Sequence, residues 1–213
     1  MINELLNATK TINNTKVTTD VAVHFTSLNW NMFETQSVIT GVNYRDLVYN
    51  NIYTPVVNSG FRPDVIGAKK DLSKYKLLFS PFMLSLDQGD LTERIHKWVE
   101  DGGVWVVGPM SDIRNSIGTR FTNRPYNSLE AFAGVRQAYE APDRDGLIKT
   151  KWNDGKEFVG KDYYELFEAD EDALATVTEG YPTLTSKATV ICKKVGKGKV
   201  YRGAQSNCRK RRL

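Results

Sequence analysis

Histidine, cysteine and serine are the first places to look for nucleophilic chemistry in this 213-residue chain, which has two histidines and two cysteines. A hydrolase or amidotransferase on an α/β sheet needs a nucleophile at a tight strand-to-helix turn, a histidine base and an acid that orients the base. His24 lies inside a strand-like run and His96 inside a helix-like run, and the chain contains no Gly-x-Ser-x-Gly or Gly-x-Cys-x-Gly pattern. We therefore expect no catalytic triad, and we interpret both histidines as core or surface residues.

Metal and cofactor sites are equally unsupported by the spacing of the candidate ligands. His24, His96, Cys192 and Cys208 lie far apart in the sequence, without the short spacings that zinc sites use. The glycine-rich stretch 196–203 resembles a phosphate-binding loop, but a dinucleotide fingerprint needs a helix after it. A strand-like run follows here instead. The stretch predicts a hairpin turn, and we expect no metal and no cofactor.

Neighbouring carboxylates could form an acid/base pair, and two groups deserve comparison. Asp87 lies close to Asp90 in the sequence, and residues 170–172 are all acidic. Paired carboxylates hydrolyse glycosides when they flank the scissile bond. Solvated loop charges and carboxylates at a helix N-terminus explain both groups equally well. We expect no catalytic residue among them.

A more suggestive segment is 26–34, which we interpret as a loop directly after the first predicted strand. It contains Trp30, Met32 and Phe33, which are large and apolar at a position where an α/β fold exposes its ligand edge. Such residues are typical of interface anchors or sugar-stacking platforms. The alternative, that this loop simply packs on its own domain, remains open.

The elements that must position these residues alternate between strands and helices. Short apolar runs at 21–25, 63–67, 75–80 and 104–107 predict buried strands, whereas 43–57 and 90–100 predict helices. This order is typical of an open, doubly wound, mostly parallel α/β sheet covered on both faces. In the second half, we predict a helix over 128–133 and strands over 172–177 and 188–192. An antiparallel hairpin is expected over 188–203, at the edge of the sheet.

Composition and charge exclude several classes of protein. The chain is 40% hydrophobic and 25% charged, without an apolar run long enough to span a bilayer and without a basic, then apolar, start typical of a secretory signal. Nine basic and no acidic residues fall within 193–213, so the net charge of +4 arises at the C-terminal end. Because no aromatic residue interleaves with the basic cluster at 209–212, a nucleic-acid stacking surface is not indicated. We expect neither a membrane nor a nucleic-acid partner.

Several segments, taken in order, carry a resemblance to a known family. They are Val21–Glu34 with its tryptophan, Tyr44–Val65, Lys76–Pro81, Trp98–Pro109, Ser111–Arg114, Phe132–Val135 and Gly196–Tyr201. In this order they resemble the middle domain of glycoside hydrolase family 42, the bacterial β-galactosidases. The resemblance extends from about Lys16 to Gln205 and rests on the joint order of the segments rather than on any single motif.

This resemblance implies a fold, a role and a location. The fold would be a three-layer sandwich of the class I glutamine amidotransferase-like (flavodoxin-like) type, without the catalytic residues of that fold. The role would be trimerisation within a bacterial, cytoplasmic enzyme that hydrolyses terminal β-D-galactosides. The two catalytic glutamates of the family belong to a preceding (β/α)₈ barrel, so no glutamate of this chain would inherit their roles. Trp30, Phe33 and Arg114 are the residues expected to contact a neighbouring subunit near its sugar pocket.

The same resemblance divides the chain into three parts. Residues 1–16 are expected to form a linker from the barrel, 17–205 the trimerisation domain, and 206–213 a basic tail that is disordered or a cloning or frame artefact. The stretch 115–126 lacks the acidic residues that the family motif leads us to expect after Arg114. Two other functions remain as alternatives. One is a sugar-binding module with Trp30 and Trp152 as stacking platforms, and the other is a free-standing amidotransferase-like enzyme.

Overall fold

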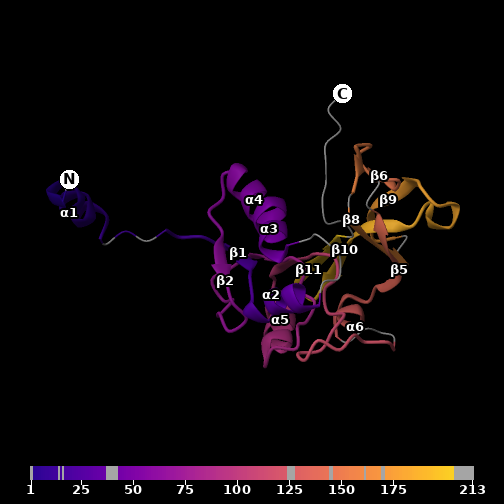
Figure 1. The fold of residues 1–213 in the computed structure, drawn as a ribbon, viewed down its shortest axis with the longest axis horizontal. Helices are drawn as coiled ribbons and strands as arrows, with labels where there is room; N and C mark the ends of the chain where they lie inside the picture. Colours follow the sequence, from indigo (N-terminus) through magenta and orange to yellow (C-terminus); the bar gives the residue numbers. More distant parts are fainter. Residues whose placement is uncertain are drawn as a thin grey trace.

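Within the described residues, eleven strands form one mixed sheet (Figure 1). The structure is a computed structural model that describes residues 2–13, 15, 17–36, 43–123, 128–143, 146–160, 162–168 and 171–203. The strands are β1 (Val21–His24), β2 (Asp64–Ile66), β3 (Leu77–Ser80), β4 (Val104–Val107), β5 (Arg136–Asp143), β6 (Lys149–Trp152), β7 (Glu157–Val159), β8 (Asp162–Glu168), β9 (Ala173–Glu179), β10 (Ala188–Val195) and β11 (Gly198–Gly203). The helices are α1 (Ile2–Ile12), α2 (Ser27–Thr35), α3 (Tyr44–Val48), α4 (Thr54–Asn58), α5 (Leu91–Glu100) and α6 (Leu129–Ala133), with a π-helical turn η1 (Tyr49–Tyr53) and a 3₁₀ turn η2 (Pro182–Leu184).

One half of the sheet is parallel and confirms the α/β class expected from the sequence. Its strands lie in the order β2-β1-β3-β4-β11, with Val23 of β1 opposite Val65 of β2 and Phe79 of β3. Parallel pairing continues from β3 to β4 and from β4 to β11. The carboxyl ends of β1, β3 and β4 therefore lie along one edge, and the segments that follow them meet there.

The other half of the sheet is antiparallel and extends from β10. Strand β10 pairs with β11, β9 and β8, while β5 pairs with β8 and β6 joins β9 to β7. The β10–β11 hairpin forms as predicted, but the expectation that it lies at the edge is wrong. Because β11 pairs with β4 on one side and β10 on the other, the hairpin joins the two halves.

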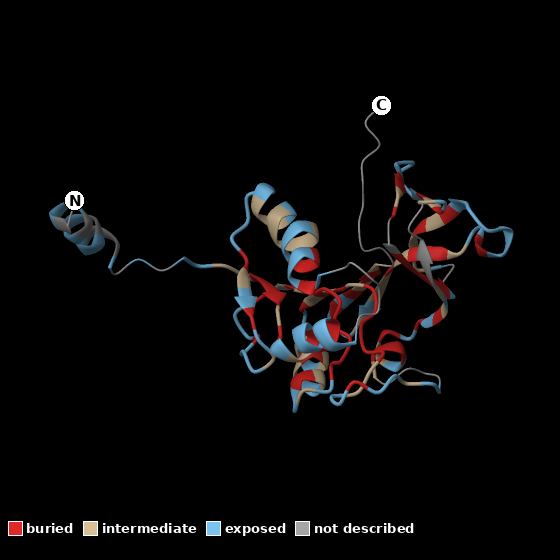
Figure 2. Ribbon diagram, in the orientation of Figure 1, coloured by how far each residue is buried: buried red, intermediate tan, exposed pale blue. Residues whose placement is uncertain are grey.

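Helices cover both faces of the parallel half, which gives the three layers. On one face, α5 buries Leu91, Ile95 and Val99 against Leu78 and Trp105. On the other face, α2 and α3 bury a set that includes the apolar residues Met32, Phe33, Tyr44 and Leu47 together with Val23. Figure 2 shows these buried positions concentrated between the helices and the strands. Because helices cover both faces of this half, its strands are short apolar runs in the sequence, which is why those runs predicted the strands correctly.

The N-terminal helix α1 stands apart from the sheet in Figure 1. Helix α1 lies within residues 1–16, the part of the chain that we expected to form a linker. None of the described helices combines the length and apolar character that a membrane span requires. The residues 206–213, which we expected to form a basic tail, lie outside the described part of the chain.

Candidate functional site

Helix α2 replaces the loop that we expected after β1, which is a correction to the sequence analysis. Thr26 caps the helix, because its side-chain oxygen accepts a hydrogen bond from the backbone N–H of Asn29. The Asn29 amide in turn donates to Thr26 and to the backbone oxygen of Ser85, and accepts from the Ser85 backbone N–H at 3.0 Å. The segment after β1 is thus helical because polar side chains fix its first turn against the loop after β3.

Trp30 lies on the solvent-facing side of α2 and is held in one orientation. Its side chain is 41% exposed, and the indole Nε1 donates to the Glu34 carboxylate at 3.2 Å. The Phe25 ring packs against the indole with 5.7 Å between ring centroids. A large aromatic side chain that is both exposed and held in place has the properties of an interface anchor.

Phe33 lies three residues further along the same helix but is only 4% exposed. Its ring stacks on Tyr44 with the centroids 5.1 Å apart, and Tyr44 stacks on Phe25 at the same separation. Trp30 and Phe33 were both expected to contact a neighbouring subunit, but Trp30 lies at the surface and Phe33 in the core. Within the described residues, Phe33 packs α2 onto the core and has almost no exposed surface for a partner.

Arg114 ends the loop that follows β4 and reaches the C-terminal end of α2. Its Nη1 donates to the side-chain oxygen of Gln36 and, at 3.2 Å, to the backbone oxygen of Gly118. Its Nε is buried without a hydrogen-bond partner among the described residues. Burial, followed by the charge of Arg120, lowers the pKa of the Arg114 guanidinium. Arg114 thus joins α2 to the 114–120 segment.

We call the exposed surface formed by Trp30, Glu34, Gln36, Arg114 and Ile117 the carboxyl-edge surface, because its segments follow β1 and β4. Ile117 is 81% exposed, the highest value among the exposed large hydrophobic side chains that the structure describes. Trp30 and Arg114 are predicted from the sequence, whereas Gln36 and Ile117 are not. No residue type marks these two in advance, since only the fold brings α2 against the 114–120 segment.

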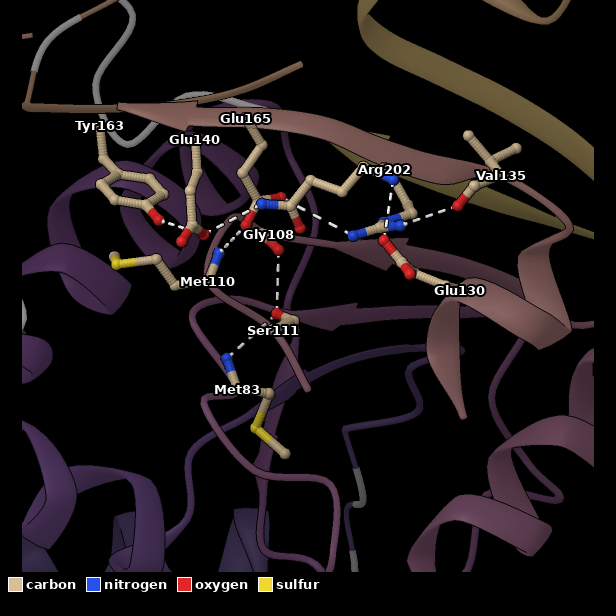
Figure 3. A network of polar contacts seen from close by, with 11 residues as sticks. Met83, Gly108, Met110, Ser111, Glu130, Val135, Glu140, Tyr163, Glu165 and Arg202 are labelled. Atoms are coloured by element: carbon tan, nitrogen blue, oxygen red, sulfur yellow. Dashed lines mark hydrogen bonds and ion pairs between the residues drawn. The ribbon is translucent and has the colours of Figure 1, made fainter. Parts of the chain in front are cut away.

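The loop between β4 and Arg114 is held by buried polar contacts (Figure 3). Met110 and Asp112 adopt the left-handed conformation, with φ of 58° and 59°, which costs free energy in non-glycine residues. The backbone N–H of Met110 donates to the Glu165 carboxylate at 2.5 Å, and Ser111 Oγ accepts from the Met83 backbone N–H at 3.2 Å. Asp112 accepts from the backbone N–H groups of Ser128 and Leu129 at the start of α6. These contacts hold the strained loop in one shape.

Neither histidine is an exposed side chain, since His24 is buried and His96 is half-buried. His24 is fully buried, and its Nδ1 shares a 2.8 Å hydrogen bond with Ser80 Oγ, which also accepts from the Trp105 indole. Its Nε2 has no partner among the described residues, and burial, followed by the charge of Arg94, lowers the pKa of His24 to about 3. His96 stacks on Phe132 with the centroids 3.7 Å apart. Ser80 and His24 touch, but both are buried, and among the described residues no acid is hydrogen-bonded to His24.

The carboxylate pairs do not come together either. Asp87 accepts hydrogen bonds from the backbone and side chain of Ser116, whereas Asp90 pairs with Arg94 at 3.0 Å. Asp170 lies outside the described residues. Trp152, the second proposed sugar platform, is half-buried and packs against Phe158 with the centroids 5.5 Å apart. The described residues contain no group of histidine, cysteine or carboxylate side chains that could hold a metal ion.

A cavity of about 730 Å³ opens at the other edge of the sheet, where β3 and β4 begin. Its lining includes Leu72, Lys76, Lys97, Trp98 and Asp101. The Trp98 indole donates a hydrogen bond to the backbone oxygen of Tyr75 at 3.0 Å. This contact fixes the segment that leads into β3. None of the residues of the carboxyl-edge surface lines this cavity.

Comparison with known proteins gives one family match over nearly the whole chain. A family model described as "Beta-galactosidase trimerisation domain" matches residues 19–210. The β-galactosidase YesZ of Bacillus licheniformis is 28% identical over 163 residues, which cover 75% of this chain and 24% of that protein. The β-galactosidase BgaA of Clostridium cellulovorans is 23% identical over 187 residues, covering 87% and 28%. The chain therefore spans about a quarter of the length of these relatives.

Solved structures show the same fold. The β-galactosidase of Bacillus circulans sp. alkalophilus matches with a TM-score of 0.85 at 21% identity, over 96% of this chain and 31% of that one. Gan42B, a GH42 β-galactosidase of G. stearothermophilus, matches with a TM-score of 0.85 at 18% identity, over 97% and 30%. The three-layer arrangement described above is thus one that these larger chains also contain.

Proposed function

The chain belongs to the β-galactosidase trimerisation domain family, and we propose that it is the assembly domain of a longer β-galactosidase. In this role it brings three copies together and takes no part in bond cleavage. The hydrolysis of terminal β-D-galactosides would fall to a (β/α)₈ barrel elsewhere in the longer protein, in the bacterial cytoplasm. Trp30 and Arg114 would contact the neighbouring copy near its sugar pocket.

The observation that carries this proposal is the carboxyl-edge surface. The edge at which open α/β sheets bind ligands is closed here by α2 and the 108–120 segment, with Trp30 and Ile117 exposed on it. An exposed, oriented tryptophan, a partly buried arginine and an exposed aliphatic residue are the combination that interface anchors show. A catalytic edge would instead present a nucleophile and a base.

The division of the chain into parts is also a proposal. We assign 1–16 to a connection from the barrel and 17–205 to the trimerisation domain. The match to Gan42B covers 97% of this chain. The unmatched residues are fewer than the 11 residues of α1, so at least part of α1 lies within the match. The position of α1 apart from the sheet suits a segment that packs on another part of the longer protein.

Variants of the carboxyl-edge surface test the proposed role in assembly. We expect Trp30→Ala and Arg114→Ala to lower the average mass measured by light scattering at a fixed concentration, with an unchanged circular dichroism spectrum. Tyr181→Ala is the matched control, because Tyr181 is a similarly exposed aromatic residue on the antiparallel half. An equal loss of mass in all three variants, or in none, would contradict the assignment of this surface.

Titration with galactose separates the assembly domain from a sugar-binding module. The assembly role predicts no saturable binding of galactose by this chain in calorimetry. Saturable binding that Trp30→Ala or Trp152→Ala abolishes would favour the sugar-binding alternative. The amidotransferase-like alternative would require glutamine hydrolysis, for which the buried Ser80 and His24 provide no accessible site.

A further inference from the structure

A charged cluster with a buried centre contacts the loop that ends at Arg114 and joins the two halves of the sheet. We call it the Glu165 cluster, and it consists of Glu165 on β8, Arg202 on β11, Glu130 on α6, Glu140 on β5 and Arg120 in the segment before α6. The side chains of Glu165 and Arg202 are 1% and 3% exposed. Charged groups are rarely buried this deeply without a specific arrangement of partners.

The contacts of the cluster connect the antiparallel half to the parallel half. The Arg202 guanidinium lies 3.8 Å from the Glu165 carboxylate, donates to the Val135 backbone oxygen at 3.4 Å and stacks over the Phe167 ring. Figure 3 places Glu130 beside the same guanidinium, and Glu130 accepts from the Gln137 backbone N–H at 2.8 Å.

Glu140 and Arg120 complete the cluster on its more exposed side. Arg120 forms an ion pair with Glu140, whose other oxygen accepts a 2.7 Å hydrogen bond from the Tyr163 phenol. The cluster therefore holds three carboxyl groups and two guanidinium groups among the described residues. With every group ionised it carries one net negative charge. Arg120 and Glu140 are 41% and 21% exposed, whereas Glu165, Glu130 and Arg202 are buried, and these three alone carry one net negative charge when ionised. A buried net charge is costly, so uptake of one proton is the simplest way to neutralise it.

Glu165 is the group at which this proton would have the greatest structural consequence. Its carboxylate accepts from the backbone N–H of Met110, and this contact holds the strained loop that ends at Arg114. Burial raises the pKa of Glu165 to about 7, against the opposing effect of Arg202 and of the Met110 hydrogen bond. Glu130 raises it further and Arg120 lowers it. A hydrogen bond to an ionised acceptor is stronger than one to a neutral acceptor.

We propose that Glu165 is a positioning residue for the loop 108–114, and that proton uptake by its carboxylate weakens the hold on Met110 and hence on Arg114. Deprotonated Glu165 fixes Met110 in its left-handed conformation through a charge-assisted hydrogen bond. Protonated Glu165 offers a neutral oxygen in place of the charged one. The consequence for assembly rests on the proposed function, whereas the hold on the loop does not.

Selective labelling gives a direct test in the full chain. The sequence contains four methionines, at 1, 32, 83 and 110, so a sample labelled with ¹⁵N-methionine yields a short list of backbone amide signals. We expect the Met110 amide proton to shift with a single midpoint near pH 7, and the Met32 amide to stay nearly constant. The Met83 amide, bonded to Ser111 in the same loop, should follow Met110 with a smaller shift.

Two variants distinguish Glu165 from the other acids. Glu165→Gln keeps an oxygen that can accept from Met110 but has no charge, so the Met110 shift should no longer depend on pH. Glu168→Gln is the matched control, because Glu168 lies on the same strand and is exposed, outside the cluster. A Met110 signal that does not titrate in the unmodified chain would overturn the proposal. So would a titration that persists in Glu165→Gln.

The effect on assembly is a separate measurement. If the carboxyl-edge surface is the contact between copies, the mass from light scattering should fall as the pH is lowered from 8 to 6, and Glu165→Gln should remove this dependence. Assembly that is absent at every pH, with the Met110 titration intact, would contradict the proposed function but not the role of Glu165. Assembly that is present but independent of pH would contradict the link to Arg114.

Discussion

Gly198, at the start of β11, lies directly against the carbonyl oxygen of Val99 near the end of α5. A Cβ atom added at Gly198 would be 2.1 Å from the Val99 oxygen and 2.3 Å from that of Gly103. Both contacts are with backbone atoms, which cannot move aside as a flexible side chain can. The glycine-rich stretch that resembles a phosphate loop is therefore a close-packed turn between β10 and β11, as the sequence analysis preferred.

Gly198→Ala should destabilise the chain strongly for this reason. We expect a loss of about 2–4 kcal/mol in the free energy of unfolding, measured by urea denaturation, because overpacking against a backbone forces it to shift. Gly203→Ala is the control on the same strand, since an added Cβ there meets nothing within 4 Å. It should change the free energy by less than about 0.5 kcal/mol. Equal effects of the two substitutions would contradict the packing described here.

Trp30 and Phe33 should give opposite results when each is changed to alanine. Phe33→Ala removes a buried ring and should cost about 3–5 kcal/mol of stability. Trp30→Ala removes a partly exposed ring and should cost about 1 kcal/mol or less, while weakening self-association. Urea denaturation and light scattering of both variants separate the two roles. A large loss of stability in Trp30→Ala would mean that the residue belongs to the core.

Neither histidine should titrate as an exposed imidazole does. Burial lowers the pKa of His24 to about 3 and also lowers the pKa of His96. Since a neutral His24 is favoured in the folded state, its contribution to stability is complete above pH 6.5 and is lost as the pH falls towards 3. Histidine side-chain signals in NMR should show His24 neutral at pH 5. A midpoint near 6.5 for His24 would contradict its burial.

Glu165 should make stability depend on pH in the opposite direction. Its pKa rises from 4.5 to about 7 on folding, so the folded chain binds this proton more tightly than the unfolded chain does. Its contribution to stability is greatest below pH 4.5 and falls as the pH rises towards 7, by about 3 kcal/mol in total. Urea denaturation of Glu165→Gln at pH 5 and pH 8 should lack this component. An identical pH dependence in the variant and the unmodified chain would show that Glu165 ionises normally.

The sequence predicted the parallel half well because its inner strands β1, β3 and β4 are covered on both faces, although Val65 of the edge strand β2 is 57% exposed. Runs such as 104–107 are continuously apolar for that reason, and β4 has these bounds in the structure. The family resemblance, stated from segments in order, is confirmed by the family match over 19–210. The segment 26–34 was wrongly predicted as a loop, because its helix depends on the cap at Thr26 and the contacts of Asn29.

The antiparallel half was predicted only in part. Strands β5 and β8 contain buried or half-buried acids, among them Glu140 and Glu165, so neither shows a clean alternation of apolar and polar residues. Their charges are compensated by Arg120 and Arg202, which are distant in sequence. The Glu165 cluster could not have been predicted from local pattern, since only the pairing of β8 with β5 and β10 assembles it. Arg114 was named, but its contact with Gln36 was not.

Sedimentation equilibrium of the unmodified chain at several concentrations tests the proposed assembly role most directly. Its monomer mass is 24.1 kDa. We predict a monomer–trimer equilibrium at pH 8, with an average mass that rises with concentration towards three times this value. A mass that stays at that of the monomer over the whole range, or that levels off at a dimer, would contradict the claim that this chain trimerises through its own surface.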